Sequence, residues 1–217
     1  MINFAPSNQV MEKEDKRANI LEAAERLFME LGYEGTSTRQ IAKEAGANMS
    51  MINYYFGSKE GVFMEIMSDR VKVFRTVIES VSQDNLTAMQ KLLKVMEGYA
   101  RKILCNPGLH KMMHRELSLP QRPEMFSTIK NAMAENIAVI EKIIREGIEE
   151  GQFRPAVDIR MLIATIIGTI SYVTNSPAKI TSGTSLDINK PEDRDAITER
   201  MISHLQDLII TYLTPKK

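Results

Sequence analysis

The sequence predicts an all-α protein in which a three-helix helix-turn-helix domain precedes a larger C-terminal helical bundle. Apolar residues recur at the 3, 4 and 7 spacing of a helix face in segment after segment. No segment shows the sustained alternation of a strand, and glycine, proline and capping residues separate the periodic segments. We expect the first domain over residues 1–62, with residues 1–14 as a loose arm, and the second over residues 63–217.

Three short helices are predicted in the first domain. The first runs from about residue 15 to residue 31, and Gly32 ends it in the position where glycine turns left-handed without steric cost. The second opens at Ser37, which forms a capping box with Gln40, and stops near Gly46. The third follows Asn48, a good N-cap, and runs over residues 49–55.

Longer helices fill the remainder of the chain. Their expected ranges are 58–81, 87–104, 109–119, 124–150, 159–175 and 191–213. Residues 176–190 are rich in Ser, Thr, Asn, Gly and Pro, which predicts a loop before the last helix.

Composition excludes several classes of protein. The single cysteine, Cys105, cannot form an internal disulfide and fits the cytoplasm, where thiols stay reduced. No stretch reaches the roughly 20 apolar residues of a membrane helix, and the first ten residues lack the pattern of a secretory signal. Net charge is zero, and residues 1–60 hold seven basic against nine acidic side chains. DNA binding therefore has to come from particular side chains, because no bulk basic footprint exists.

Residues 36–56 have the layout of a helix-turn-helix, in which the second helix enters the major groove. Small residues, Ala45-Gly46-Ala47, lie where the two helices must approach closely. The expected outward face of the second helix comprises Asn48, Met49, Ser50, Asn53 and Tyr54. An asparagine can read an adenine edge, and a methionine can contact a thymine methyl group.

Phosphate contacts are expected on both sides of that helix. Thr36, Ser37 and Thr38 lie at a helix N-terminus, where free amides and the helix dipole favour an anion. Lys59, beside Ser58, repeats this arrangement at the next helix. The spacing alone leaves an alternative open, since a glycine turn between two short helices also occurs in proteins that never bind DNA.

Residues 17–62 closely resemble the N-terminal domain of the tetracycline-repressor (TetR) family. The resemblance rests on Ile20-Leu21-Glu22-Ala23-Ala24, Leu27-Phe28, Gly32-Tyr33, Thr36-Ser37-Thr38-Arg39-Gln40-Ile41-Ala42, Ala45-Gly46 and Asn53-Tyr54-Tyr55-Phe56-Gly57-Ser58-Lys59-Glu60-Gly61. It implies a dimeric transcriptional regulator, commonly a repressor, that binds palindromic operator DNA and is released by a small-molecule effector. Met49 and Asn53 depart from the residues most frequent in the family, which affects the operator sequence and not the fold.

Carried over by position, the resemblance implies base reading by residues 48–53 and phosphate contacts from Thr36, Tyr54, Tyr55 and Lys59. The whole set expected at DNA is Thr36, Ser37, Thr38, Arg39, Asn48, Met49, Ser50, Asn53, Tyr54, Tyr55 and Lys59.

Residues beyond about 75 resemble the ligand-binding and dimerisation domain of the same family. Methionine adapts to irregular spaces and varied ligands, which suggests a mostly apolar effector. The expected ligand-binding residues are Met96, Tyr99, Met112, Met113, His114, Phe126, Met133 and Tyr172. Ordinary core packing is the alternative for each of them.

Two helices are candidates for a homodimer interface. Residues 161–172 are apolar nearly all round, with small residues Ala164, Gly168 and Ser171 at helical spacing. The last helix carries a second apolar stripe at Ile202 and Ile209. Two helices from each subunit would form a four-helix bundle about a two-fold axis; the alternative is that both are core helices of a monomer.

Other chemistries find little support in the sequence. Cys105, His110 and His114 could hold zinc, but no dense Cys/His cluster exists, so we expect no metal and no cofactor. No phosphate-binding glycine loop, nucleophile elbow or zinc-protease motif occurs, so we expect no enzyme. Two alternatives stay open: a regulator that senses no ligand, and a helical enzyme or carrier with a vestigial helix-turn-helix.

Overall fold

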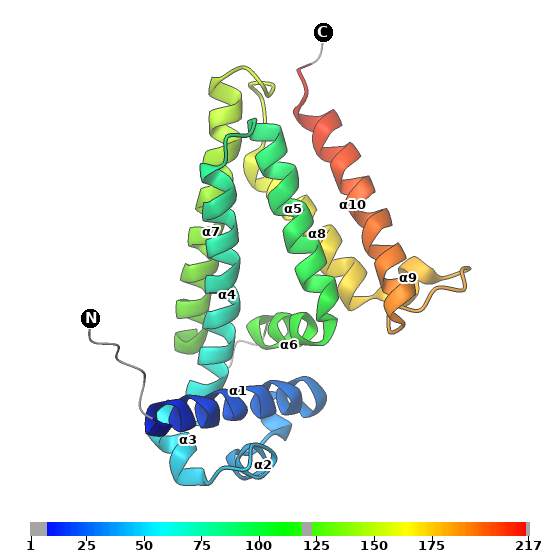
Figure 1. Cartoon of the computed structure of the whole chain (residues 1–217). Coiled ribbons are helices and arrows are strands. Elements are labelled where there is room, and N and C mark those ends of the chain that lie inside the picture. The colour runs from blue at the N-terminus through cyan, green and yellow to red at the C-terminus, as the bar shows by residue number, and fades with distance from the viewer. Residues whose placement is uncertain (1–7, 119–122, 216–217) are drawn as a thin grey trace, which may run out of the picture. The chain divides into compact units, whose positions relative to one another are not determined.

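The computed structural model describes residues 8–118 and 123–215, and every regular element in them is a helix (Figure 1). The elements are α1 (Asn8–Gly35), α2 (Thr38–Glu44), α3 (Met49–Phe56), α4 (Lys59–Gln83), α5 (Ala88–Cys105), α6 (Pro107–Ser118), α7 (Pro123–Glu149), α8 (Ile159–Asn175), α9 (Pro177–Thr181) and α10 (Pro191–Leu213). The predicted all-α class is confirmed. None of the helices in the described part of the chain is both long and apolar enough to cross a membrane.

The chain forms two compact units, which are described separately. The first comprises residues 1–70 and 112–129, and the second comprises residues 71–111 and 130–217. The units change over inside α4, between Arg70 and Val71. The domain division after residue 62 stays a prediction.

Helix α1 starts earlier than the sequence predicts. It begins at Asn8, so residues 8–14 are helical and not a loose arm, whereas residues 1–7 lie outside the described part of the chain. The predicted break at Gly32 is present as a kink, with φ 75° and ψ 171°. Only glycine reaches such a conformation at low cost, and the chain resumes one more turn to Gly35.

Local capping explains why α2, α3 and α8 begin where they do. The Ser37 hydroxyl accepts from the Gln40 amide while the Gln40 side chain accepts from the Ser37 amide, which is the predicted capping box. The Asn48 side chain accepts from the amide of Met51 at 2.9 Å. Asp158 caps α8 in the same way. Each cap satisfies a backbone donor that the helix leaves without a partner.

A junction between the end of α1 and the start of α4 organises the first unit. The buried Thr36 hydroxyl donates to the carbonyls of Gly32 at 2.8 Å and Leu27 at 3.1 Å. The Lys59 ammonium donates to the carbonyls of Tyr33 and Thr36, both at 2.9 Å, and lies 4.2 Å from the centre of the Tyr33 ring. These bonds bring side-chain donors to carbonyls at and near the end of α1 and connect the segment between α1 and α2 to α4.

The second unit is built around one continuous apolar core. Its central, fully buried side chains include Leu104, Ile144, Phe153, Ile170 and Leu205, from α5, α7, the turn after α7, α8 and α10. Ile202 and Ile209 also belong to this core, with exposures of 3% and 0%. The sequence-based prediction that they form an outer stripe for dimerisation is therefore wrong, because both side chains are used inside the chain.

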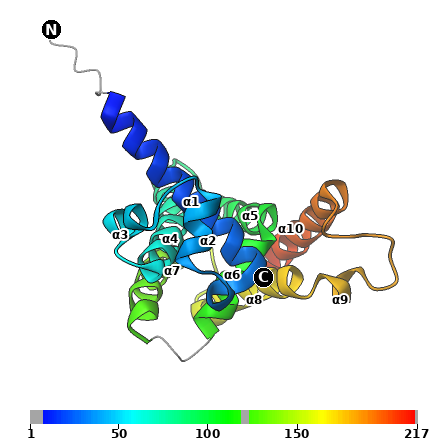
Figure 2. The ribbon, with the colours of Figure 1, turned by 90° about the horizontal axis from the view of Figure 1, so that it is seen from below.

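The segment between α8 and α10 is only partly the predicted loop. Residues 177–181 form the short helix α9, opened by Pro177 at its first position, where proline needs no hydrogen-bonding amide. After α9, a loop extends away from the helices and leads back to Pro191, the first residue of α10 (Figure 2).

We predict opposite effects for two glycine-to-alanine substitutions in helices of the second unit. A Cβ at Gly147 would collide with the Phe153 ring and come within 2.8 Å of the Ala88 Cβ, whereas a Cβ at Gly98 meets nothing within 4 Å. Gly147→Ala should destabilise the fold by about 1–3 kcal/mol through overpacking. Gly98→Ala should stabilise it by about 0.5–1 kcal/mol through helix propensity. Urea unfolding followed by circular dichroism measures both, and equal effects would contradict the packing at Gly147.

Thr36→Val should destabilise the protein by about 1–2 kcal/mol, because it removes a buried hydroxyl whose single proton is shared between the Gly32 and Leu27 carbonyls. Thr76→Val is the matched control, since the Thr76 hydroxyl makes the same kind of bond to the Lys72 carbonyl but is exposed. The control should change stability by less than about 0.5 kcal/mol. Equal unfolding midpoints for Thr36→Val and the wild type would contradict the structural role of Thr36.

Candidate nucleic-acid interface

Helix α3 presents a polar, exposed ridge on the first unit. Ile52 is fully buried and pins the helix to the unit. On the other side, Met49 is 45% exposed and Tyr54 76% exposed, and Ser50 and Asn53 are exposed as well. These four residues fall at the i, i+1, i+4 and i+5 positions of one helix face, as the sequence predicts for a recognition helix.

The ridge contains both occupied and available hydrogen-bonding groups. The side-chain oxygen of Asn48, Oδ1, accepts from the Met51 amide at 2.9 Å and from the Ser50 hydroxyl at 2.6 Å. The Asn48 side-chain amide and the Ser50 lone pairs stay available for other partners. No described residue bonds the side chain of Asn53, so its amide can offer a donor and an acceptor to a base edge.

Charge pairing leaves a basic strip beside this ridge. Salt bridges join Arg17 to Glu65, Arg26 to Glu44 and Arg70 to Glu25. Arg39 and Lys43 are both exposed on α2, and no described acid pairs with either. They are four residues apart and so lie on one helix face.

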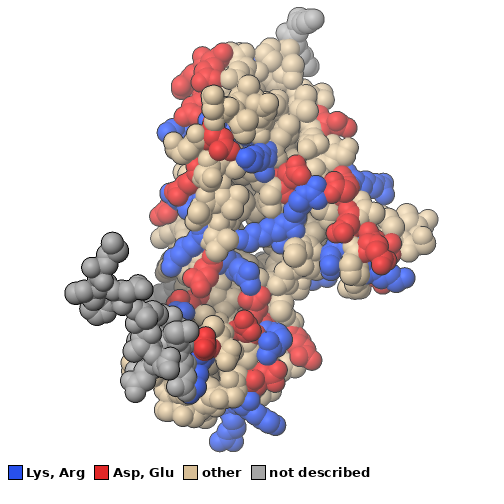
Figure 3. Space-filling view, viewed as in Figure 1, with Lys and Arg blue, Asp and Glu red and all other residues tan. Residues whose placement is uncertain are grey.

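Figure 3 shows acidic and basic side chains interspersed over the first unit, with basic side chains at its lower end. The basic footprint that bulk composition lacks is therefore local. The sequence analysis included Arg39 but missed Lys43, which the i+4 spacing could have indicated.

Two residues expected at phosphate groups face inward instead. Thr36 is 1% exposed and its hydroxyl is used by α1, so its side chain is not placed to contact a phosphate. Capping and phosphate binding favour the same residue types, so the sequence could not distinguish this structural role of Thr36 from a phosphate contact, which stays a prediction. The Lys59 ammonium donates two of its three N–H groups to backbone carbonyls of Tyr33 and Thr36. Burial lowers the pKa of Lys59, and the nearby Glu116 carboxylate partly offsets this.

The remaining expected DNA contacts lie at or near the surface. Ser37 and Thr38 open α2, with Ser37 exposed and Thr38 half-buried. Tyr55 is half-buried, and its ring meets that of Tyr54 edge-on at 5.1 Å between centres. Their DNA contacts stay predictions.

The expected ligand-binding residues of the second unit do not form one cluster. Met96 is 2% exposed within the core, Met133 is half-buried on α7, and Tyr172 is 48% exposed on α8 with the Lys179 ammonium 5.8 Å from its ring. Tyr99 packs against Phe74 of α4, with 4.9 Å between ring centres. Burial raises the pKa of the Tyr99 hydroxyl, which therefore stays protonated at neutral pH.

The other expected ligand-binding residues belong to the first unit. Met112 is buried, Met113 half-buried and His114 exposed on α6. Phe126 falls in α7, but its side chain lies outside the described ones.

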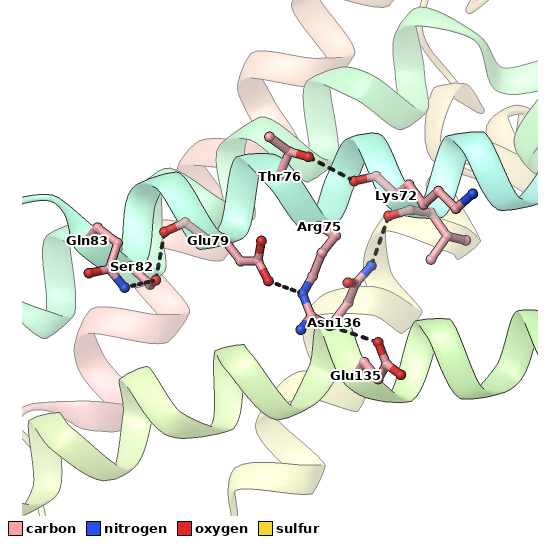
Figure 4. A network of polar contacts seen from close by, with 9 residues as sticks. Lys72, Arg75, Thr76, Glu79, Ser82, Gln83, Glu135 and Asn136 are labelled. Carbon is pink, nitrogen blue, oxygen red and sulfur yellow. Dashed lines mark hydrogen bonds and ion pairs between the residues drawn. The ribbon is translucent and has the colours of Figure 1, made fainter.

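Helix α7 carries a buried polar residue that the sequence analysis overlooked. Asn136 is 6% exposed, and its side-chain amide donates to the backbone carbonyl of Val71 in α4 at 3.2 Å (Figure 4). Its carbonyl oxygen, Oδ1, is buried without a hydrogen-bond partner in the described structure. The available signal was its spacing, three residues after Met133 and four before Ile140, which puts an asparagine on the apolar stripe of α7.

The three candidate zinc ligands are not brought together. Cys105 is exposed, and His110 Nε2 lies 3.3 Å from the Ser171 hydroxyl. Among the residues that the structure describes, no three His, Cys, Asp or Glu side chains form a group suited to a metal ion.

Helix α8 has an uncharged face that the core does not cover. Met161 is 60% exposed, and Ala164, Thr165 and Gly168 continue the same exposed stripe toward Tyr172. Ser171, expected on this face, is instead half-buried beside His110. The stripe fits close approach of a second helix, because its central residues are small.

Comparison with known sequences assigns both parts of the chain. The profile described as "Bacterial regulatory proteins, tetR family" matches residues 20–66. The profile described as "Tetracyclin repressor-like, C-terminal domain" matches residues 86–205, more than half of the chain.

Individual relatives agree with these profiles. The fatty acid metabolism regulator protein of Bacillus subtilis is 26% identical over 159 residues, which cover 73% of this chain and 81% of that protein. The crystal structure of the transcriptional regulator FadR from Bacillus subtilis in complex with stearoyl-CoA has a TM-score of 0.69 and 22% identity, with coverage of 87% and 96%. AibR in complex with isovaleryl coenzyme A and operator DNA has a TM-score of 0.68 and 20% identity, with coverage of 88% and 97%.

The all-helical fold, the helix-turn-helix with its exposed α3 ridge, and matches over both the N-terminal and C-terminal parts lead to one assignment. This chain belongs to the tetR family of bacterial regulatory proteins and is a transcriptional regulator.

Proposed function

We propose that the protein is a cytoplasmic repressor that binds palindromic operator DNA as a homodimer and leaves it when a small molecule binds the C-terminal domain. The α3 ridge and the neighbouring cations of α2 support DNA binding. Among the described residues, the Asn53 side chain has no hydrogen-bond partner, Tyr54 is exposed, and Arg39 and Lys43 form no ion pair. Such a surface supplies base edges and phosphates with separate partners. No catalytic role is proposed.

Each side chain has a distinct part in the proposed complex. Met49, Ser50 and Asn53 face base edges in the major groove. Ser37, Thr38, Tyr54 and Tyr55 contact phosphates on either side, and Arg39 and Lys43 supply the positive charge. Phosphate contacts set the register of α3, and Met49, Ser50 and Asn53 select the sequence.

The uncharged stripe on α8 supports the homodimer. A two-fold axis that pairs this stripe with its copy buries Met161 and Tyr172 and lets Gly168 approach the facing backbone. Dimerisation then spaces the two recognition helices for half-sites about 34 Å apart.

An acyl thioester is the effector class to examine first. The relatives named above carry stearoyl-CoA and isovaleryl coenzyme A in their structures, and the second unit of this chain has a large apolar core. An effector lowers DNA affinity only if it binds a state of the dimer that fits the operator less well. A regulator that responds to neither thioester would point to another effector or to a protein partner.

Selection of bound sequences from a random DNA pool by the purified protein tests the DNA part. We expect an enriched inverted repeat, and we expect Tyr54→Ala to weaken binding to it similarly across sequences, since a phosphate contact carries no base information. Asn53→Ala should instead relax the preference at one base pair per half-site, at a cost of about 1–3 kcal/mol.

Arg200→Ala is the matched control, because Arg200 is an exposed cation on α10 and has no proposed DNA role. Each selection should state its salt concentration. Failure to enrich any sequence at low salt would overturn the proposed function, and enrichment without inverted symmetry would overturn the dimer.

A further inference from the structure

The α4–α7 contact of the second unit contains a polar atom that the resting structure does not satisfy. Asn136 Oδ1 is buried and has no hydrogen-bond partner in the described structure, while the amide of the same side chain is held by the Val71 carbonyl. A buried acceptor without a partner lowers stability. Leucine at this position would avoid that cost, so packing alone does not explain an asparagine.

The orientation of the Asn136 side chain follows from its surroundings. Reversing the amide would set Oδ1 against the Val71 carbonyl, which is also an acceptor, and would leave the amide donors buried without partners. The observed orientation gives one good bond and one orphan acceptor. What the site lacks is therefore a hydrogen-bond donor.

The surroundings of Asn136 define the rest of a ligand. One helical turn further along, Phe74 of α4 and Val139 and Ile140 of α7 pack on an apolar cluster formed by Ile78, Val81 and Val95. Phe74 also contacts the ring of Tyr99. A ligand group that displaces these side chains would have apolar neighbours, which favours an apolar, uncharged body, because burying an unpaired charge there would be costly.

The arginine nearest to Asn136 in this network is already paired with carboxylates. Arg75 forms ion pairs with Glu79 of its own helix and with Glu135 of α7, beside Asn136 (Figure 4). An anionic ligand group therefore finds the Arg75 guanidinium already occupied. Oδ1 is sealed from solvent, so a ligand reaches it only when nearby side chains move, and flexible Met133, one turn before Asn136, suits that movement.

We propose that Asn136 is the specificity-determining residue of effector binding: it selects a ligand whose part buried at the α4–α7 contact is uncharged and apolar and carries an N–H or O–H donor, which Oδ1 accepts. This inference rests on the proposed function. Because the same side chain holds the Val71 carbonyl, at the point where α4 enters the second unit, ligand capture acts directly on the helix that continues to Lys59 and the DNA-binding unit.

Paired probes that differ only in the donor test the proposal on the full chain. Octanamide and 1-octanol carry a donor; N,N-dimethyloctanamide and methyl octyl ether are their donor-free counterparts. We expect a donor-bearing probe, at several times its Kd, to raise the wild-type Tm by about 2 °C or more. Its counterpart should give no shift. Equal shifts within both pairs, or none with any probe, would overturn the proposal.

Asn136→Leu provides the second arm. It removes the orphan acceptor, so its Tm should equal or exceed that of the wild type, and it should no longer distinguish the two members of a pair. Asn131→Leu, at an exposed position of the same helix, is the control and should retain the discrimination. A Tm of Asn136→Leu well below that of the wild type would show that Asn136 is needed for packing and would contradict the assignment.

The probe comparison on the wild-type chain does not depend on how the variants fold. DNA selection on the same preparations separates the role of Asn136 from the proposed DNA-binding function. Enrichment of an inverted repeat without discrimination between paired probes overturns only the role of Asn136. Absence of DNA binding overturns the proposed function itself.

Discussion

The hydrogen bonds from the Lys59 ammonium to carbonyls at the end of α1 are the interaction on which the DNA-binding unit depends. Carbonyls near a helix end need partners from outside the helix. Here the Lys59 ammonium donates to the carbonyls of Tyr33 and Thr36, and the Thr36 hydroxyl donates to those of Gly32 and Leu27. Since Lys59 is also the first residue of α4, one side chain ties the helix that leaves the unit to the helix that supports α2. The exposed α3 ridge is positioned by this inward-facing chemistry.

Pairing of charges explains how a chain of zero net charge can carry a DNA-binding surface. Three arginines of the first unit are neutralised by carboxylates, and these pairs tie α1 to α2 and α4. The unpaired Arg39 and Lys43 of α2 lie next in sequence to the α3 ridge. Local arrangement, and not total charge, sets the potential that DNA meets. In the second unit, Arg75 is likewise paired with Glu79 and Glu135.

Sequence reasoning succeeded where the determinant is local. The caps at Ser37, Asn48 and Asp158, the break at Gly32 and the buried faces follow from residues within one or two turns of each other. It failed where tertiary contacts decide. Thr36 looks like a phosphate ligand until the end of α1 buries it, and Ile202 and Ile209 look like an outer stripe until the core is seen to bury them together with Leu205. Asn136 Oδ1 is buried without a partner only because α4 packs on α7. The sequence therefore predicts that Asn136 lies on the apolar stripe of α7, but not that its side-chain oxygen is left unbonded.

Amide hydrogen exchange and operator affinity of Lys59→Met, measured together against salt concentration on DNA selected by the wild type, test the role of Lys59 most directly. The methionine keeps the stem and removes the ammonium. If Lys59 holds the junction, amides of α2 and α3 exchange faster, affinity falls, and the slope of log affinity against log salt stays the same. Unchanged exchange with a slope smaller by about one would instead make Lys59 a phosphate contact and contradict this account.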